Sequence, residues 1–240
     1  MINSILEDEI RAHAIEYGTR ECCGLVVKLP NGSLIYYKAN NLSVLPDNFI
    51  IDPKSIIEAE NLGTIECIVH SHVNYTEALS PTDSASHAKS GYYWIIYSLK
   101  TEVFGHYPPV QTYKIPPLIG RKFIFGVQDC YTLIQDYYKI TLDIALKDYP
   151  REDKFWDRLE NLYVDRFIDA GFTQVPMESL KTHDVVLLKL GVTSISNHGA
   201  VYLGNGNILH HVQNRLSEES QYIRHWKSMT THVLRYNTLI

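Results

Sequence analysis

The chain has 240 residues, of which 45% are hydrophobic and 20% are charged, and its formal net charge is -5. This length and composition predict an ordinary soluble globular protein with one large domain or two small ones. Up to Lys114 there are 13 acidic and 8 basic residues, and the remainder is neutral, so neither half has the positive footprint of a nucleic-acid-binding protein.

Targeting signals and disulfides are not expected. No apolar run approaches the ~20 residues that cross a bilayer. The stretch from Met1 to Glu9 is acidic and lacks the basic start of a signal peptide, so we expect a chain that is made and kept in a cytoplasm. The four cysteines include no Cys-x-x-Cys pair, and we expect reduced thiols, at least one of them present for its reactivity.

The first half alternates helical and strand patterns. The apolar spacing predicts a helix over residues 4–17 that ends at Gly18, and the turn signal Asn31-Gly32 predicts a hairpin. We expect the other helices at 53–61 and from Ser80 onward, and strands at 23–27, 34–37, 49–51, 66–70 and 92–97.

A proline-rich stretch separates two domains. Two Pro pairs, Pro108-Pro109 and Pro116-Pro117, make it the best linker candidate. The domains are therefore expected at 1–106 and 119–240, with a linker at 107–118, and both have an α+β pattern. In the second domain we expect helices at 129–139 and 153–170, and a small sheet from 185–188, 198–203 and 208–210.

The first group of polar residues has the spacing of a metal site. His70 and His72 lie two apart on an expected strand, so both rings project from one face. A catalytic zinc ion takes three protein ligands and leaves one position for water, and Asp83 can be the third ligand from the first turn of the next helix. A further carboxylate is needed to accept the proton of that water. Taken alone, each element is more often a polar strand end or a capped helix.

The combination resembles the JAMM (MPN-plus) metalloprotease family. Its signature is His-x-His, seven residues, Ser, two residues and Asp, with an upstream Glu, and residues 70–83 match it with Glu21 upstream. The resemblance implies a cytidine-deaminase-like α/β sandwich with zinc (Zn2+) held by His70, His72 and Asp83. It further implies Glu21 as the general base and Ser80 as a hydroxyl that steadies the oxyanion. Many members have Pro after the second His, where this chain has Val73.

The second group has the pattern of a cysteine nucleophile. Cys130 begins an expected helix, whose N-terminus favours the thiolate, although Asp129 beside it works against this. His198 is the candidate base, and His210 lies near it if a tight hairpin joins their strands. His211 is the rival for the third role, but strand alternation sends it to the opposite face. The alternative is a buried cysteine that has a structural role and no catalytic one.

This half resembles the NlpC-type cell-wall peptidases, which have a papain-like fold. Family members carry Asp-Cys at a helix start, then His with a Gly/apolar strand, then a polar residue twelve positions further on. Cys130, His198 and His210 fit in that order, although many members have Ser-Gly after the Cys where this chain has Tyr131-Thr132. The resemblance implies a peptidoglycan endopeptidase.

The two domains in this order are similar to the tail-assembly proteins of lambda-like long-tailed phages. That resemblance implies a tail-tip protein in the virion, assembled in the host cytoplasm, whose partners are other tail-tip proteins and whose substrate is peptidoglycan. Such a protein would help to assemble the tip and open the cell wall during DNA entry, with no nucleic-acid binding of its own. The substrate of the zinc domain stays open.

Two other classes of function compete with a two-site hydrolase. The chain could be a tail-assembly scaffold in which one or both sites are vestigial, although the intact zinc-site residues argue against complete decay. It could also be a host isopeptidase that cleaves a small protein modifier, which the cysteine domain makes less favoured.

Overall fold

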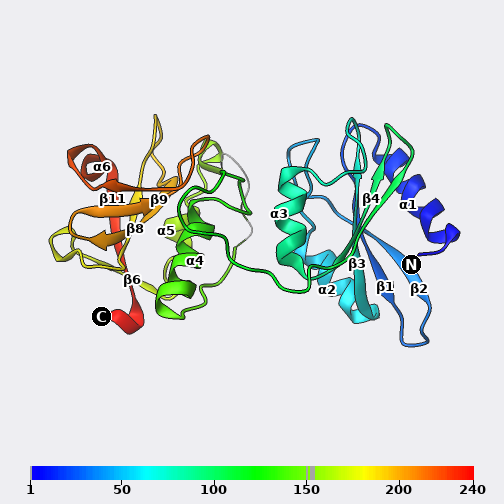
Figure 1. The fold of residues 1–240 in the computed structure, drawn as a ribbon, viewed down its shortest axis with the longest axis horizontal. Helices are drawn as coiled ribbons and strands as arrows, with labels where there is room; N and C mark the ends of the chain where they lie inside the picture. The colour runs from blue at the N-terminus through cyan, green and yellow to red at the C-terminus, as the bar shows by residue number, and fades with distance from the viewer. Residues whose placement is uncertain (1, 150, 152–154) are drawn as a thin grey trace. The chain divides into compact units, whose positions relative to one another are not determined.

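The computed structural model describes residues 2–149, 151 and 155–240, and it divides the chain into two compact units, Met1–Tyr113 and Lys114–Ile240 (Figure 1). Each unit combines helices with one β-sheet, so the expected mixed α+β class is confirmed. None of the helices in the described ranges is both long and apolar enough to cross a membrane.

A five-stranded sheet in the order β2-β1-β3-β4-β5 forms the first unit. The strands are β1 (Cys23–Lys28), β2 (Leu34–Ala39), β3 (Thr64–His72), β4 (Tyr93–Ser98) and β5 (Phe104–Tyr107). Only β3 and β4 run parallel, because helix α3 (Pro81–Ser90) connects them as a crossover. The carboxyl end of β3 therefore meets the start of a helix, which is a common place for a functional site.

Helices α1 (Ser4–Tyr17) and α2 (Pro53–Leu62) pack on different core clusters of this sheet. In α1, Leu6, Ile10 and Ala14 recur every four residues and are buried against Val26 and Val69, which explains the helical spacing in the sequence. Asn3 caps the helix start and Gly18, at φ 65°, ends it as predicted.

Two expectations for the first unit differ from the structure. Residues 49–51 form no strand, and Ile51 makes only an isolated bridge with Asn41. Strand β5 was not expected, and it runs to Tyr107, which lies inside the proline-rich stretch assigned to the linker. Its four residues are too few for a period to stand out.

The second unit has a six-stranded antiparallel sheet in the order β10-β9-β8-β7-β11-β6. The strands are β6 (Phe172–Val175), β7 (Val185–Leu188), β8 (His198–Gly204), β9 (Asn207–His210), β10 (Glu218–Gln221) and β11 (Thr230–Tyr236). Helix α4 (Cys130–Leu142) packs on β8 through Leu133 and Ile134, in a core that includes Leu187 and Val201. Helix α6 (Arg224–Met229) precedes β11. The sheet has three strands more than expected. Strands β6, β10 and β11 were not predicted because their sequences show little apolar alternation.

The long helix expected over residues 153–170 does not form. The structure instead has a 3-10 turn at Phe155–Arg158 and a five-residue helix, α5 (Leu162–Arg166), while residues 153 and 154 lie outside the described part of the chain. Leu159 is 69% exposed and has a positive φ of 60° between the two turns. A left-handed residue cannot continue a right-handed helix, so the helical period breaks there.

Candidate functional site

The expected metal ligands meet at the carboxyl end of β3. His70 and His72 are buried, and their Nε2 atoms lie 3.2 Å apart because alternate residues share one face of the strand. The ring of His72 is oriented by its Nδ1, which donates a 2.6 Å hydrogen bond to the carbonyl of Thr76. In the neutral ring that a metal ion requires, this hydrogen bond would leave the lone pair of Nε2 directed at the centre of the site.

Asp83 reaches the same point from the first turn of α3. Its Oδ1 lies 3.3 Å from His70 Nε2, and its Oδ2 lies 3.2 Å from His72 Nε2. Burial alone would raise the pKa of Asp83, but the hydrogen bonds with His70 and His72 outweigh it, so its pKa lies below the usual value. The carboxylate is therefore charged and available as a ligand.

This donor set fits zinc. Two imidazoles and one carboxylate are ligands that catalytic zinc ions take, and tetrahedral bonds of about 2.05 Å place neighbouring ligand atoms roughly 3.3 Å apart. The Nε2 atoms of His70 and His72 are 3.2 Å apart, and with one ligand atom taken from each of His70, His72 and Asp83 the three atoms lie within 4.8 Å of one another. Within the described residues they are the one group of three or more His, Cys, Asp or Glu side chains close enough to hold a metal ion.

Glu21 lies beside this cluster, just before β1. Its Oε1 is 4.0 Å from His72 Nε2, and Glu21 is 4% exposed. Two hydrogen bonds between Cys22 and Ser71 place it there: the Cys22 N–H donates to Ser71 Oγ, and the Ser71 N–H donates to the Cys22 carbonyl. Burial raises the pKa of Glu21 to about 8 in the metal-free protein, and the nearby His72 acts in the opposite direction.

Ser80 is the N-cap of α3. Its Oγ accepts a 3.1 Å hydrogen bond from the Asp83 N–H, and Asp83 Oδ2 accepts a 2.8 Å hydrogen bond from the Ser80 N–H. This reciprocal capping box fixes the carboxylate of Asp83 at the metal position. The hydroxyl of Ser80 therefore caps the turn that carries Asp83, and the Ser80 backbone N–H holds the carboxylate. A role of the hydroxyl toward an oxyanion stays a proposal.

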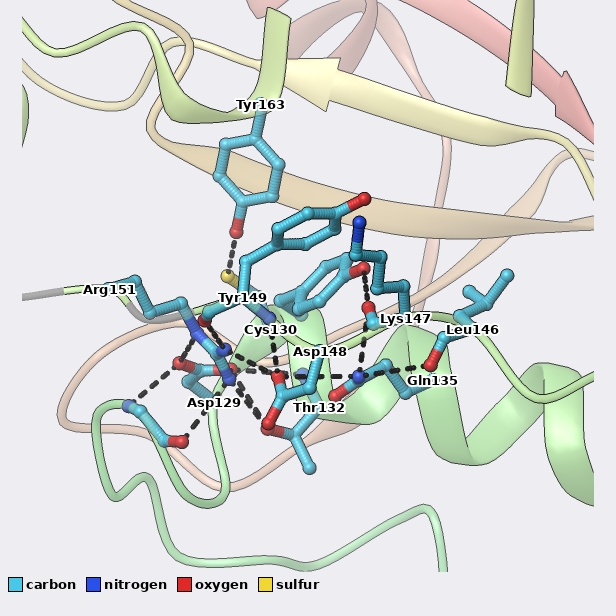
Figure 2. A network of polar contacts seen from close by, with 12 residues as sticks. Asp129, Cys130, Thr132, Gln135, Leu146, Lys147, Asp148, Tyr149, Arg151 and Tyr163 are labelled. Carbon is cyan, nitrogen blue, oxygen red and sulfur yellow. Dashed lines mark hydrogen bonds and ion pairs between the residues drawn. The ribbon is translucent and has the colours of Figure 1, made fainter. Parts of the chain in front are cut away.

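In the second unit, Cys130 is the first residue of α4 and is 7% exposed. Asp129 caps the helix, with its Oδ1 accepting from the Thr132 N–H, and the Cys130 Sγ lies 3.0 Å from the hydroxyl of Tyr163 (Figure 2). Burial raises the pKa of the Cys130 thiol to about 11, Asp129 adds to the rise, and the Tyr163 hydroxyl opposes it. The resting thiol is therefore protonated at neutral pH.

The two candidate histidines lie on neighbouring strands. The rings of His198 on β8 and His210 on β9 are 5.6 Å apart, as the hairpin spacing predicted. His210 Nε2 lies 3.0 Å from Ser220 Oγ, and its ring packs on Trp226. Burial lowers the pKa of His198 to about 3 and that of His210 to about 4, so both rings are neutral.

Cys130 and His198 line one cavity of about 370 Å³. His211 also lines this cavity, whereas His210 does not. Strand β9 ends at His210, so the strand alternation used to place His211 on the opposite face does not extend to it. Arg151, Trp156 and Tyr163 also line the cavity. Their place at the cysteine site was not predicted, because a helical period indicates which side chains face inward but not which site they reach.

The family comparisons match each unit separately. The model for prokaryotic homologs of the JAB domain matches residues 4–108, and the model for the NlpC/P60 family matches residues 120–235. By these matches the protein has an N-terminal JAB-like domain and a C-terminal NlpC/P60 domain.

Two relatives match across most of their own length. The chain is 34% identical over 187 residues to the "Tail tip assembly protein K" of Escherichia phage lambda, covering 78% of this chain and 89% of that protein. It is 31% identical over 235 residues to the protein of the same name in Escherichia phage N15, covering 95% and 93%. The chain therefore belongs to the family of phage tail tip assembly protein K.

The crystal structure of an NLP/P60-family, lipoprotein-like protein from Staphylococcus aureus is also similar. It is 15% identical, covers 96% of this chain and 61% of its own, and has a TM-score of 0.34.

Proposed function

We propose that this chain takes part in assembling a phage tail tip and carries two hydrolase sites, one of which opens peptidoglycan during DNA entry. The observation that carries the proposal is the convergence of His70, His72 and Asp83 on one point with Glu21 beside them, since a scaffold has no need of this arrangement. The names of the two relatives support the assembly role and tail-tip proteins as partners. On this proposal the chain ends up at the tail tip of the virion.

The cysteine site would carry out acyl transfer on a stem peptide of the cell wall. His198 takes the proton of the Cys130 thiol, and Sγ attacks the carbonyl carbon of the scissile amide. The C–N bond breaks as His198 returns the proton to the leaving amine. Water then hydrolyses the thioester, which releases the acid and restores the thiol. His210 is proposed to orient His198, in view of the 5.6 Å between their rings.

The zinc site would hydrolyse an amide or isopeptide bond. A zinc ion held by His70, His72 and Asp83 would act as a Lewis acid toward the amide carbonyl and lower the pKa of a bound water. Glu21 is placed to take up a proton at Oε1 and to return it to the leaving amine. Ser80 is proposed to assist the oxyanion.

The residue boundaries belong to the same proposal. We assign the zinc domain to residues 1–106, a linker to 107–118 and the cysteine domain to 119–240. The two compact units divide after Tyr113, inside this linker.

Digestion of purified peptidoglycan sacculi tests the proposal. Wild type, Cys130→Ala and Glu21→Ala are incubated with sacculi, and the products are identified by mass spectrometry. We expect stem-peptide fragments from wild type and Glu21→Ala and none from Cys130→Ala. A folded, zinc-loaded wild type that releases no fragments would contradict wall cleavage.

A scaffold in which the cysteine site is vestigial is the second candidate. One observation favours it: burial holds both the Cys130 thiol and the His198 ring in their neutral forms, so no thiolate–imidazolium pair exists at rest. If this candidate is right, electron microscopy of lysates should show the Cys130→Ala variant assembling tails as wild type does. Sacculi should stay intact with both proteins.

A further inference from the structure

The residue before the nucleophile is a buried carboxylate. Asp129 is 1% exposed and directly precedes Cys130, and its negative charge disfavours the thiolate. Its presence is explained in part by capping, since Oδ1 accepts from the Thr132 N–H at 2.9 Å and Oδ2 accepts from the Gly126 N–H at 2.8 Å. A capping Asn or Ser would accept from the Thr132 N–H without the charge, but has no second oxygen for the Gly126 N–H.

Arg151 supplies the opposite charge from the connection between α4 and β6. Its Nε donates to Asp129 Oδ2 at 2.7 Å and its Nη2 to Asp129 Oδ1 at 3.0 Å, which is a bidentate pair (Figure 2). Nη2 also donates to Thr132 Oγ1 at 2.9 Å, so the guanidinium holds the first turn of α4 at two residues. The Arg151 side chain is 8% exposed.

Further contacts fix the guanidinium itself. Nη1 donates to Asp148 Oδ1 and to the Tyr149 carbonyl, both at 3.0 Å, and the ring of Tyr131 lies 5.1 Å away. A planar group held on several sides keeps its orientation, which a flexible Lys ammonium would not do. The same connection carries Tyr163, whose hydroxyl lies 3.0 Å from Cys130 Sγ.

We propose that Arg151 is a positioning residue for the cysteine site, which neutralises Asp129 and fixes the helix turn that presents Cys130. The inference rests on the proposed function of that site. Arg151 acts through Asp129 and does not itself contact Sγ in the hydrogen-bond pattern of the described residues.

Several groups face Cys130 and set its titration. Asp129 acts from the helix cap, Arg151 and Tyr163 from the connection, and the Gly199 backbone from β8. His198 and His211 line the same cavity. Of these, Asp129 and Arg151 carry full charges of opposite sign, so their removal has opposite effects on the thiol.

This opposition provides the test. The titration of Cys130 is followed by the ¹³C chemical shift of its Cβ in protein labelled at cysteine, with Cys130→Ser to assign the signal. Arg151→Gln is expected to shift the midpoint upward by about one unit, equivalent to a tenfold loss of thiolate at a given pH, and Asp129→Asn to shift it downward. Arg151→Lys should restore part of the shift.

The controls separate this role from a structural one. Arg166→Gln removes the same charge from the exposed face of α5 and should leave the midpoint unchanged. A merely structural ion pair predicts shifts of the same sign for Asp129→Asn and Arg151→Gln, because each breaks the pair, and that result overturns the inference. If Arg151→Gln does not fold, Arg151→Lys takes its place. The midpoint of Arg151→Lys should then shift slightly upward, and that of Asp129→Asn should shift downward.

The inference and the proposed function can fail separately. Opposite shifts in a protein that releases no fragments from sacculi would leave Arg151 as proposed and reject wall cleavage. Fragments released equally by wild type and Arg151→Gln, with no shift in the midpoint, would reject the role of Arg151 alone.

Discussion

At the scale of single residues, His70 shows how the candidate metal position is built. Its ring is stacked on Phe49, with centroids 4.4 Å apart, and its edge meets Trp94 at 5.5 Å. Phe49 is carried by a loop that Asn41 holds through hydrogen bonds to the carbonyls of Glu21 and Asn48. Aromatic packing thus restricts the ring of His70, while the backbone of Glu21 is held by the same Asn41 side chain.

Variants of Glu21 and of the candidate ligands should therefore differ in how much zinc they bind. We expect Glu21→Gln to retain about one equivalent of zinc, since it leaves the ligand set of His70, His72 and Asp83 intact. His72→Ala removes a ligand and should lose the metal or bind it at least tenfold more weakly. Zinc content after dialysis, measured by atomic emission, checks both. If the Glu21→Gln variant loses its zinc, Glu21 is itself a ligand.

At the scale of elements, the start of α3 combines a helix cap with a candidate metal ligand. The capping box between Ser80 and Asp83 satisfies two backbone N–H groups and fixes the Asp83 carboxylate. The stability of the helix and the geometry of the site therefore depend on the same two hydrogen bonds.

Replacing Ser80 tests this coupling. Ser80→Ala removes the hydroxyl that accepts from the Asp83 N–H but keeps the Ser80 N–H that donates to the carboxylate. It is expected to reduce the free energy of unfolding by about 1 kcal/mol and to weaken zinc binding only through the loosened first turn of α3. Ser80→Thr keeps a capping hydroxyl and should stay close to wild type in both. Urea unfolding and zinc titration with a competing chelator give the two values. Unchanged zinc affinity in a destabilised Ser80→Ala would show that Asp83 is held independently.

The hairpin of β8 and β9 carries the two buried neutral histidines. Burial lowers the pKa of His210 to about 4, whereas the unfolded chain binds a proton at about pH 6.5. Between these values the unfolded state binds more protons than the folded state, so stability falls as the pH decreases from about 6.5 toward 4.

His210→Gln should remove part of this acid sensitivity. The drop in urea unfolding midpoint between pH 7.5 and pH 5 is expected to be smaller for His210→Gln than for wild type. His225→Gln, a change at an exposed position, is the matched control and should drop as wild type does. An equal drop in all three proteins would mean that His210 is protonated in the folded state.

At the scale of the whole molecule, each unit has its own sheet and its own core. The buried clusters around Ile10 and Val69 belong to the first unit, and those around Leu133 and Val186 belong to the second. The candidate metal ligands all lie in the first unit, and the candidate cysteine and histidines all lie in the second. A ligand of one site should therefore stabilise one unit.

Calorimetry with and without zinc checks this separation. Zinc at 100 times its dissociation constant is expected to stabilise the first unit by about 2.7 kcal/mol and to leave the unfolding of the second unit unchanged. The chelator EDTA should reverse the effect, and the response should be absent in His70→Ala. A zinc-dependent shift that persists in His70→Ala would place the metal elsewhere.

Much of the fold could be predicted because its signals are local. The four-residue spacing in α1, the Pro at the start of α2 and α3, and the turn between β1 and β2 all act over a few residues. The segment 153–170 shows where this fails. Its helical period suggested a long helix, but the structure breaks it at Leu159 and uses Phe155 and Tyr163 to cover the cysteine cavity. Tertiary packing overrode local propensity there.

The sequence by itself determined the candidate residues of both sites and their order. For His70, His72 and Asp83 this was possible because strand alternation and helix capping act within one short stretch. Only the tertiary structure decided which distant residues complete the sites. Arg151 pairs with Asp129 across 22 positions, and Phe49 stacks on His70 across 21. A buried charge needs a partner and a buried ring needs a packing surface, but the sequence does not indicate which distant residue will provide them.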